Sequence, residues 1–390
     1  MADLMGKANL LGQAARFDLC GAGCKSGERM RDDIGRWIYP AALPDGRRVN
    51  LFKVLLTNAC ERDCGYCANR SSRNGPRTSF EPGELAATFA ELVRRNLASG
   101  LFLSSAVYGS SAQAMERMIA AVEIVRFKYG FRGYVHLKIL PGAEEAEVER
   151  ATRLAQRVSV NLEAPNPARL AILSGSKRFR EDLLQRMRWA DAYMHEPGAI
   201  STGQTTQFVV GAAGETDREI LLTTSRLYRE LRLARAYFSA FQPVPGTPLE
   251  GLPPTPTLRE HRLYQSDFLL RQYGFVFDEL IFDGEGNLPL TRDPKLLWAQ
   301  RHPERFPLEI NRAEREDLLR VPGIGPRSAG RILAARRERA LRDLETLGRL
   351  GVTVGRAAPF VLLAGRRPPV QLSLWGEEVA PLGESILKPA

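Results

Sequence analysis

Three of the five cysteines in this chain of 390 residues stand close together, at Cys60, Cys64 and Cys67. Their C-x3-C-x2-C spacing comes directly after a short apolar run that reads as a β-strand. Three thiolates can hold three irons of a [4Fe–4S] cluster and leave the fourth iron open to another ligand. A structural zinc site normally has four protein ligands, and the histidine nearest in sequence is His136. The motif therefore favours an iron–sulfur cluster over zinc.

A scaffold for these cysteines is predicted by alternating strand-like and helix-like segments from about residue 50 to residue 275. Short apolar or β-branched runs, typical of buried parallel strands, occupy residues 51–57, 101–105, 134–140, 158–164, 205–211 and 236–244. Segments with helical periodicity follow at residues 84–97, 112–129, 144–156, 180–194, 217–233 and 258–273. Six such repeats predict an α/β fold with a parallel sheet, either an open doubly wound sheet or a barrel.

The cysteine motif and the repeat together resemble the radical S-adenosylmethionine (SAM) superfamily. The motif is C-x3-C-x-aromatic-C after the first strand of a six-fold β/α repeat, and the resemblance covers about residues 50–280. It implies a partial (β/α)6 barrel and a [4Fe–4S] cluster whose open iron is chelated by SAM. It also implies that Tyr66 packs near the adenine and that a donor such as flavodoxin or ferredoxin reduces the cluster. SAM would then be cleaved to a radical that abstracts hydrogen from the substrate.

Candidate SAM contacts lie at the ends of the second and fourth predicted strands. Where the family carries a Gly-Gly-Glu element for the methionine amino group, this chain has Ser104 and Ser105, whose hydroxyls and carbonyls could replace those contacts. Asn161 and Glu163 stand two apart, so an extended strand would present them on the same face. They are candidates for ribose or methionine contacts, or else for hydrogen bonds within a polar core.

Two further pairs of residues are placed in the barrel by the same periodicity. His136 and Lys138 share one face of the third predicted strand. Gln207 begins the apolar stretch of the fifth strand, and Gly211 ends it where the backbone could approach the adenine. A satisfied polar core or a solvent contact at a strand end is the alternative for each. The sequence does not identify a catalytic residue.

The net charge of +10 is concentrated near the C-terminus. Residues 320–367 hold eleven arginines and only three acids, a net charge of +8, which leaves +2 for the rest of the chain. A solvated helical surface would be the ordinary explanation of such a segment. The clustering favours a separate module that binds nucleic acid.

Residues 319–333, at the start of this basic segment, resemble a helix-hairpin-helix motif. Gly323 and Gly325 permit a tight turn whose backbone N–H groups could approach a phosphate. Arg327 and Arg331 are four apart and would lie on one helical face. Such contacts bind the sugar-phosphate backbone of DNA and carry little sequence information. The alternative is a glycine-rich turn used only for helix packing.

The helix-hairpin-helix resemblance covers about residues 312–365 and includes a degenerate second hairpin at residues 347–352. With the repeat region, it divides the chain into a short N-terminal segment, a radical SAM barrel, a DNA-binding module and a flexible tail. The predicted bounds of these four parts are residues 1–49, 50–299, 300–367 and 368–390.

The tail contains a short segment that resembles the peptide by which bacterial replication and repair proteins dock on the sliding clamp. Its candidate contact residues are Gln371, Leu372, Leu374 and Trp375. An extended peptide can present such side chains to pockets on a partner. Packing of an apolar tail is the alternative.

The two remaining cysteines, Cys20 and Cys24, repeat the C-x3-C spacing near the N-terminus. Two thiols do not build a standard cluster alone. Small buried residues in a loop are the first interpretation, and a redox or auxiliary metal role is the second.

Together these features resemble the radical SAM proteins with a C-terminal helix-hairpin-helix that are described as DNA modification or repair enzymes. The resemblance implies radical chemistry on a DNA base or nucleotide and a companion similar to uracil-DNA glycosylase. Two alternatives stay open: an RNA-modifying enzyme with the same core, and a non-catalytic DNA-binding repair protein with a structural or redox-sensing cluster.

Composition sets the remaining expectations. Hydrophobic residues make up 44% of the chain and charged residues 26%, which is typical of globular proteins and excludes wholesale disorder. The sequence contains no apolar run long enough for a transmembrane helix and no secretory signal pattern. We therefore expect a cytoplasmic protein without a membrane partner.

Overall fold

The computed structural model describes residues 2–15, 37–42 and 48–369. The chain divides into two compact units, which are treated separately below. Of the described residues, the first unit contains those up to Glu215 together with Arg226–Glu260, and the second contains Thr216–Ser225 and His261–Pro369. No helix among the described residues is both long enough and apolar enough to cross a membrane.

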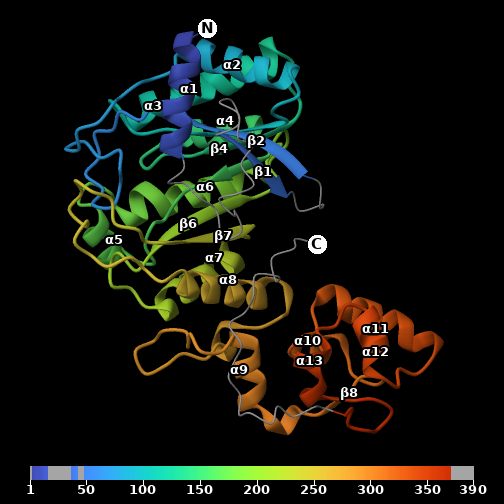
Figure 1. Ribbon diagram of the computed structural model, residues 1–390. Coiled ribbons are helices and arrows are strands. Elements are labelled where there is room, and N and C mark those ends of the chain that lie inside the picture. Colours follow the sequence, from blue (N-terminus) through green and yellow to red (C-terminus); the bar gives the residue numbers. More distant parts are fainter. Residues whose placement is uncertain (1, 16–36, 43–47, 370–390) are drawn as a thin grey trace. The chain divides into compact units, whose positions relative to one another are not determined.

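The first unit is built on a seven-stranded sheet whose strands follow one another in chain order (Figure 1). All neighbours pair in parallel except the first two. A doubly wound sheet would reverse its strand order at a switch point, so the unbroken order identifies a partial barrel. The strands are β1 (Ile38–Ala42), β2 (Arg48–Leu55), β3 (Gly100–Ser104), β4 (Tyr134–Lys138), β5 (Arg157–Ser159), β6 (Gln204–Val210) and β7 (Arg235–Ala240).

Helices connect the parallel strands, and both faces of the central strands are covered. Every residue of β3 and β6 is buried, as expected for parallel strands between two layers. The helices of the first unit are α1 (Ala2–Ala14), which precedes the sheet, α2 (Pro82–Arg94), α3 (Ser111–Glu123), α4 (Glu145–Leu154), α5 (Pro167–Leu173) and α6 (Gln185–Tyr193). Helices α7 (Asp217–Glu230) and α8 (Thr257–Gln272) are each divided between the two units. Turns of π-helix extend α3 through Lys128 and precede α6 from Phe179.

Two elements differ from the sequence-based expectation. Strand β1 was not predicted, because Pro40 interrupts its pattern; proline is tolerated there since β1 is an edge strand. Strand β5 ends at Ser159, so the prediction of a strand over residues 158–164 was wrong in its second half. Asn161 and Glu163 lie in the following segment, where Glu163 adopts a left-handed backbone with φ of 63° and makes only an isolated bridge to Phe208.

The second unit includes a group of short helices with its own apolar core. Its elements are α9 (Pro294–Arg301), β8 (Leu308–Glu309), α10 (Arg315–Arg320), α11 (Pro326–Glu338), α12 (Leu344–Arg349), α13 (Val354–Ala357) and β9 (Val361–Leu362). Buried Leu318, Leu319, Ile324, Ile332 and Leu347 are central members of the core. Small helices of this kind depend on such packing, because isolated helices of their length are unstable in water.

Candidate functional site

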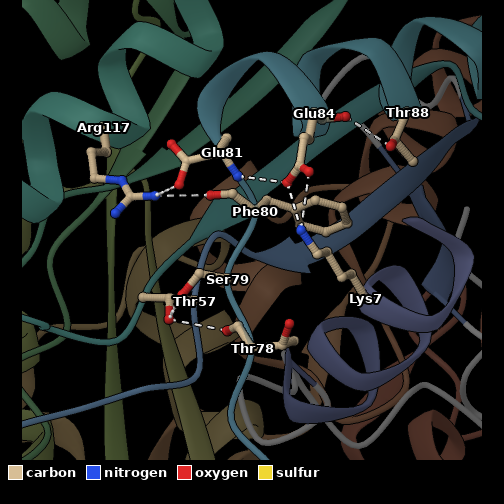
Figure 2. Close-up of polar contacts among 9 residues, drawn as sticks. All are labelled: Lys7, Thr57, Thr78, Ser79, Phe80, Glu81, Glu84, Thr88 and Arg117. Atoms are coloured by element: carbon tan, nitrogen blue, oxygen red, sulfur yellow. Dashed lines mark hydrogen bonds and ion pairs between the residues drawn. The ribbon is translucent and has the colours of Figure 1, made fainter. Parts of the chain in front are cut away.

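The loop that carries Cys60, Cys64 and Cys67 leaves the end of β2 and is closed at its base by a short antiparallel neck. Figure 2 shows that the hydroxyl of Thr57 donates to the carbonyl of Thr78 (3.1 Å), and Ser79 donates to the Thr57 hydroxyl (2.6 Å). The N–H of Phe80 also donates to the carbonyl of Leu56 at 2.8 Å. The neck therefore holds the two ends of the loop together at the edge of the sheet.

Two ion pairs connect the neck with neighbouring helices (Figure 2). Lys7 of α1 contacts the carboxylate of Glu84 at 2.8 Å, and Arg117 of α3 contacts Glu81 at 3.0 Å. The hydrogen bond from Lys7 lowers the pKa of Glu84. Both pairs are solvent-accessible, so each contributes at most about 1 kcal/mol to stability. Their main effect is to align α1 and α3 with the start of α2.

Inside the loop, a single arginine binds four backbone carbonyls. One terminal nitrogen of Arg77 donates to the carbonyls of Asn58 and Asn69, and the other to those of Arg70 (2.8 Å) and Arg73 (2.9 Å). The loop has little regular structure, so its buried carbonyls need side-chain donors. The planar fork of a guanidinium can supply several at once. Sequence reasoning missed Arg77, because its four partners are set by the path of the loop.

A second anchor is the carboxylate of Asp63, which joins the loop to the segment after α5. It accepts hydrogen bonds from the hydroxyls of Ser174 (2.6 Å) and Ser176 (2.7 Å) and from the N–H of Gly175 (3.0 Å). Burial by itself would raise the pKa of Asp63, but these hydrogen bonds outweigh it and lower the pKa to about 2. The N–H of Gly65 adds a further bond to the carbonyl of Leu173 at 2.7 Å.

The three thiols of the loop suit a cluster better than a single ion. Cys64 is buried, while Cys60 and Cys67 are partly buried. Burial, and then the nearby Cys64, raise the pKa of Cys67 to about 12, so a bound metal would be needed to keep it as a thiolate. Among the described residues, no three His, Cys, Asp or Glu side chains meet around one ion. A [4Fe–4S] cluster binds each cysteine through a different iron, so its ligands need not meet.

Backbone donors also point at the cysteine sulfurs. The N–H of Arg62 lies 3.4 Å from the Sγ of Cys60, and the N–H of Asn69 lies 3.4 Å from the Sγ of Cys67. Hydrogen bonds to the sulfurs are one of the means by which a protein sets the reduction potential of an iron–sulfur cluster. The loop thus provides both the ligands and part of their surroundings.

Beside the thiols lies a group formed by Tyr66, Glu163 and Lys177, of which Glu163 is buried and the other two are partly buried. The Nζ of Lys177 is 3.8 Å from the Oε1 of Glu163 and 5.9 Å from the centre of the Tyr66 ring. Burial raises the pKa of Tyr66 well above its usual value. The negative charge of the neighbouring Glu163 carboxylate raises this pKa further. Burial would lower the pKa of Lys177, but Cys64 and Glu163 outweigh it and raise that pKa.

Sequence reasoning found two members of this group and missed the third. Tyr66 follows from the cysteine motif and Glu163 from a polar position after a buried strand. Lys177 follows a short helix in a polar segment with no periodic pattern, so nothing in the sequence distinguishes it from a surface lysine. Its side chain is only 7% exposed.

Ser104 and Ser105 lie beside the neck of the cysteine loop. The carbonyl of Ser104 accepts the N–H of Leu56 at 2.8 Å, and the N–H of Ala106 donates to the carbonyl of Thr57 at 3.0 Å. The hydroxyl of Ser105 donates to the carbonyl of Ala106 at 2.8 Å. A contact between either serine and the methionine amino group stays a prediction.

Gln207 and Gly211 have different surroundings. The carbonyl of Gln207 accepts the N–H of Glu163 at 2.9 Å, which fixes the left-handed residue beside β6. The N–H of Gly211 donates to the carboxylate of Glu215, and a Cβ at Gly211 would lie 2.0 Å from the hydroxyl of Thr255. Glycine is therefore required there for a close approach of protein segments, and an adenine contact stays a prediction.

Several predicted interior residues line one small cavity in the barrel. They are His136, Lys138, Asn161 and Gln207, together with Phe102, Ser159 and Tyr237. His136 hydrogen-bonds through Nε2 to the hydroxyl of Ser159 at 2.9 Å. The structure thus brings residues from five strands, β3 to β7, to one wall.

A larger cavity of about 560 Å³ opens on the outer side of the cysteine loop. The lining includes the two serines Ser110 and Ser111. It also includes three arginines, Arg62, Arg178 and Arg186, and two carboxylates, Glu144 and Asp182. Arg62 is held by the hydroxyl of Ser111 at 3.0 Å. The lining is polar and of mixed charge.

In the second unit, two pairs of helices are joined by tight turns that contact each other. The first turn links α10 to α11 and contains Gly323, with φ of 85°. The second links α12 to α13 and contains Gly351, with φ of 86°. The N–H of Thr353 donates to the carbonyl of Gly323 at 3.0 Å, and Arg331 lies 3.2 Å from the Cβ position of Gly351.

A buried lysine on α9 donates a hydrogen bond to the first turn. The ammonium of Lys295 on α9 donates to the carbonyl of Ile324, and the N–H of Gly325 donates to the hydroxyl of Ser328 at 2.8 Å. Burial lowers the pKa of Lys295. Arg327 and Arg331 are exposed on α11.

The remaining predicted residues fall outside the described part of the chain. These are Cys20 and Cys24, and the tail residues Gln371, Leu372, Leu374 and Trp375.

Comparison with known proteins agrees with the cysteine loop and the barrel. The model of the Radical SAM superfamily matches residues 54–227. These residues form a radical SAM domain. The barrel is accordingly a partial radical SAM barrel, and the superfamily uses a [4Fe–4S] cluster and SAM.

Individual relatives of the radical SAM domain are distant. A tRNA-2-methylthio-N(6)-dimethylallyladenosine synthase from Tropheryma whipplei (strain Twist) is 27% identical over 227 residues, covering 55% of this chain and 46% of that protein. The chain thus spans about half the length of this curated relative. Among solved structures, the [FeFe]-hydrogenase maturase HydG has 11% identity and a TM-score of 0.45, covering 55% of this chain and 48% of its own. Methylornithine synthase (PylB) has 16% identity and a TM-score of 0.45, and the match covers 55% of this chain and 60% of the PylB chain.

The residues of the radical SAM domain fit the group that the superfamily uses. Three thiols on one anchored loop can bind three irons, and the partly buried Tyr66 and an ion pair adjoin them. When bound, the cluster and SAM supply one-electron reductive cleavage of the sulfonium. The chain would contribute the three thiolate ligands and the N–H donors to two of the sulfurs.

Proposed function

We propose that this protein is a radical SAM enzyme that modifies or repairs a base or nucleotide of DNA. The proposal is supported by the occurrence, in one chain, of a radical SAM domain and two contacting helical hairpins with exposed arginines. The hairpins are the observation that carries it. Gly323 and Gly351 both have left-handed backbones, and the first turn precedes α11, whose first N–H groups could bind phosphate.

In this proposal the helix-hairpin-helix module binds the sugar-phosphate backbone, and the barrel receives the nucleotide. Arg327 and Arg331 would add charge to the backbone N–H groups near Gly323 and Gly325. A base inside a duplex is inaccessible, so the target would have to be single-stranded or turned out of the stack.

RNA is the second candidate substrate, because the relative from Tropheryma whipplei is named for a tRNA modification. Backbone contacts from hairpins do not by themselves distinguish DNA from RNA. A test of the substrate must therefore offer both nucleic acids.

Other partners remain predictions of the sequence. These are the uracil-DNA-glycosylase-like companion, the sliding clamp bound by residues 371–375, and the flavodoxin or ferredoxin electron donor. A cytoplasmic location is a prediction of the same kind.

Anaerobic reconstitution of the full chain tests the proposal. With reductant and SAM, we expect formation of 5′-deoxyadenosine that increases when a DNA duplex or single strand is added. Cys60→Ala should abolish this cleavage and leave duplex affinity unchanged. A loaded protein that never cleaves SAM would favour a non-catalytic repair protein, and stimulation by tRNA but not DNA would favour the RNA-modifying alternative.

The hairpins are tested separately by placing a negative charge on α11. Gly330 is exposed and a Cβ there meets nothing within 4 Å, so Gly330→Glu should not disturb the fold. We expect it to weaken duplex binding about tenfold at low salt, since a carboxylate would face the phosphates. Gly284→Glu, at an exposed loop position with equal space, is the control with the same change of charge. Equal binding by both variants would contradict the assignment.

A further inference from the structure

The larger cavity, of about 560 Å³, lies where the chain leaves the C-terminal ends of three adjacent strands. Its lining comes from the cysteine loop after β2, from residues 107–112 after β3 and from residues 142–144 after β4, and residues 176–186 form a fourth wall. In β/α barrels the loops at these strand ends carry the ligand-binding residues. The volume is within the usual range of ligand pockets, so position and size both indicate a binding site.

Three arginines from separate segments meet at this cavity. Arg62 belongs to the cysteine loop, whereas Arg178 and Arg186 come from the fourth wall. Burial lowers the pKa of Arg186; Asp182 raises it, and the positive charge of Arg178 lowers it again, so the guanidinium groups of Arg178 and Arg186 are near each other. Like charges that are held together repel, and an anion bound between them would relieve this repulsion.

The walls of the cavity use only part of the hydrogen-bonding capacity of these arginines. A guanidinium has five N–H donors. Within the described ranges, Arg62 uses two of them, on the hydroxyl of Ser111 (3.0 Å) and the carbonyl of Ser176 (3.1 Å). Arg178 uses one, on the carboxylate of Asp182 at 3.2 Å. These bonds fix the guanidinium groups in place and leave N–H donors for a ligand.

Three carboxylates on the same lining indicate the kind of ligand. Asp182 accepts the backbone N–H of Arg178 at 2.8 Å as well as its guanidinium, so it belongs to the wall. Glu61 and Glu144 are exposed and can accept N–H donors. They would repel a partner surface that carries only acidic groups. A nucleotide offers a phosphate to the arginines and the N–H groups of its base to the carboxylates.

An exposed aromatic ring stands beside the cavity. Tyr108 lies between the lining residues Val107 and Gly109, and it is 58% exposed. The bases of single-stranded nucleic acid stack on such rings with little regard to sequence, and the sites that bind them combine aromatic rings with positive charge. The lining and this ring therefore match a nucleotide better than an inorganic anion.

We propose that this cavity is a nucleotide-binding site that holds a phosphate of the substrate strand. The guanidinium groups of Arg62, Arg178 and Arg186 bind the phosphate, and the base lies on Tyr108. The inference rests on the proposed function, because a strand held here would pass beside the cluster loop that contains Arg62. It adds a contact on the first unit to those expected of the hairpins. A free nucleotide offers the same chemistry, and the experiment below separates the two sources.

Ser110 allows a negative charge to be added to the lining without loss of structure. It is the N-cap of α3, and its hydroxyl accepts the N–H of Gln113 at 3.0 Å. Aspartate and asparagine cap helices about as well as serine. Ser110→Asp therefore places a carboxylate at the cavity, and Ser110→Asn is its neutral control of the same shape.

The test measures binding of a short fluorescein-labelled thymidine strand to the full chain with its cluster reconstituted, by anaerobic fluorescence anisotropy at equal iron content. Ser110→Asp should weaken binding about tenfold, because its carboxylate repels the phosphate, and Ser110→Asn should bind within about twofold of the wild type. Arg178→Gln should weaken binding about fivefold. Arg180→Gln removes the same charge from an exposed position outside the lining and should change binding less than about twofold.

The base contact is tested with the same strand. Tyr108→Ala should weaken binding about tenfold, whereas Tyr108→Phe keeps the ring and should bind like the wild type. Equal binding by these two variants would overturn the placement of the base on Tyr108.

Competition by small ligands identifies the source of the phosphate. It is measured in Gly330→Glu, which weakens the hairpins and leaves the cavity intact. The dinucleotide TpT carries a strand phosphodiester, thymidine 5′-monophosphate carries a terminal phosphate, and thymidine has neither. Stronger displacement by TpT supports a strand phosphate, and stronger displacement by the monophosphate supports a free nucleotide. Equal displacement by all three ligands would overturn a phosphate site.

Equal strand binding by Ser110→Asp and Ser110→Asn would also overturn the proposal. Unchanged strand binding together with a loss of cluster reduction by flavodoxin in Ser110→Asp would assign the cavity to an acidic electron donor instead. A protein that binds the strand here and never cleaves SAM would contradict only the proposed function. SAM cleavage that DNA stimulates equally in both Ser110 variants, with equal strand binding, would contradict only this site.

Discussion

The carbonyl oxygen of Gly323 accepts a hydrogen bond from the N–H of Thr353 at 3.0 Å, and this bond joins the turns of the two helix pairs. A Cβ at Gly323 would lie 2.5 Å from the carbonyl oxygen of Thr353. The close approach of the two turns therefore requires glycine, independently of any ligand.

Gly323→Ala should destabilise the second unit. The new methyl group would clash with backbone atoms, and alanine is strained at a φ of 85°, so we expect a loss of about 1–3 kcal/mol. Hydrogen exchange of peptides from residues 315–360 in increasing urea measures the change. Gly330→Ala is the control: it has open space within a helix, and it should be neutral or stabilising by up to about 1 kcal/mol. Equal stability of the two variants would contradict the packing argument.

Arg327→Ala combined with Arg331→Ala should reduce the salt dependence of duplex binding. Each lost phosphate contact lowers the slope of log K against log salt by about 1, so we expect the slope to fall by about 2. Fluorescence anisotropy at several salt concentrations measures it. Arg366→Ala combined with Arg367→Ala removes the same charge from exposed positions of the same unit outside the hairpins. If both double variants lower the slope equally, net charge alone accounts for binding.

Arg77→Met should impair loading of the cluster. Its guanidinium binds four carbonyls of the cysteine loop, and methionine of similar length offers no donor, so the loop would lose its shape. We expect less than half of the wild-type iron content after reconstitution, with an unchanged circular dichroism spectrum. Arg117→Met removes a solvent-accessible ion pair at the neck and should load iron normally. Full iron content in Arg77→Met would show that the hydrogen bonds from Arg77 to the loop carbonyls are not needed for cluster loading.

Asp63→Asn should lower stability at neutral pH and lose this effect in acid. The folded-state pKa of Asp63 is depressed to about 2, below the usual value for an aspartate, so its charge stabilises the fold above the unfolded pKa. That stabilisation is lost as the pH falls from about 4 through about 2. Thermal unfolding of the iron-free wild type and variant from pH 7 to pH 2 should show converging melting temperatures. A constant difference over this range would contradict a role for the charge.

The sequence by itself determined the chemistry of the cluster and the class of the fold. Cys60, Cys64 and Cys67 are local in the chain, so their spacing reports ligand chemistry without knowledge of the fold. Strand and helix periodicities are local in the same way, and they predicted the parallel repeat. Gly323 likewise marked a turn, because few residues other than glycine adopt its left-handed backbone.

Only the tertiary structure decided which residues surround those cysteines. Lys177 reaches Glu163 and Cys64 from a distant segment, and Arg77 binds carbonyls that the path of the loop brings together. Strand β5 ends at Ser159, and Glu163 adopts a left-handed conformation held by β6, which no local pattern in the sequence records. The choice of a partial barrel over a doubly wound sheet also depended on strand order, because both folds share the same local repeat.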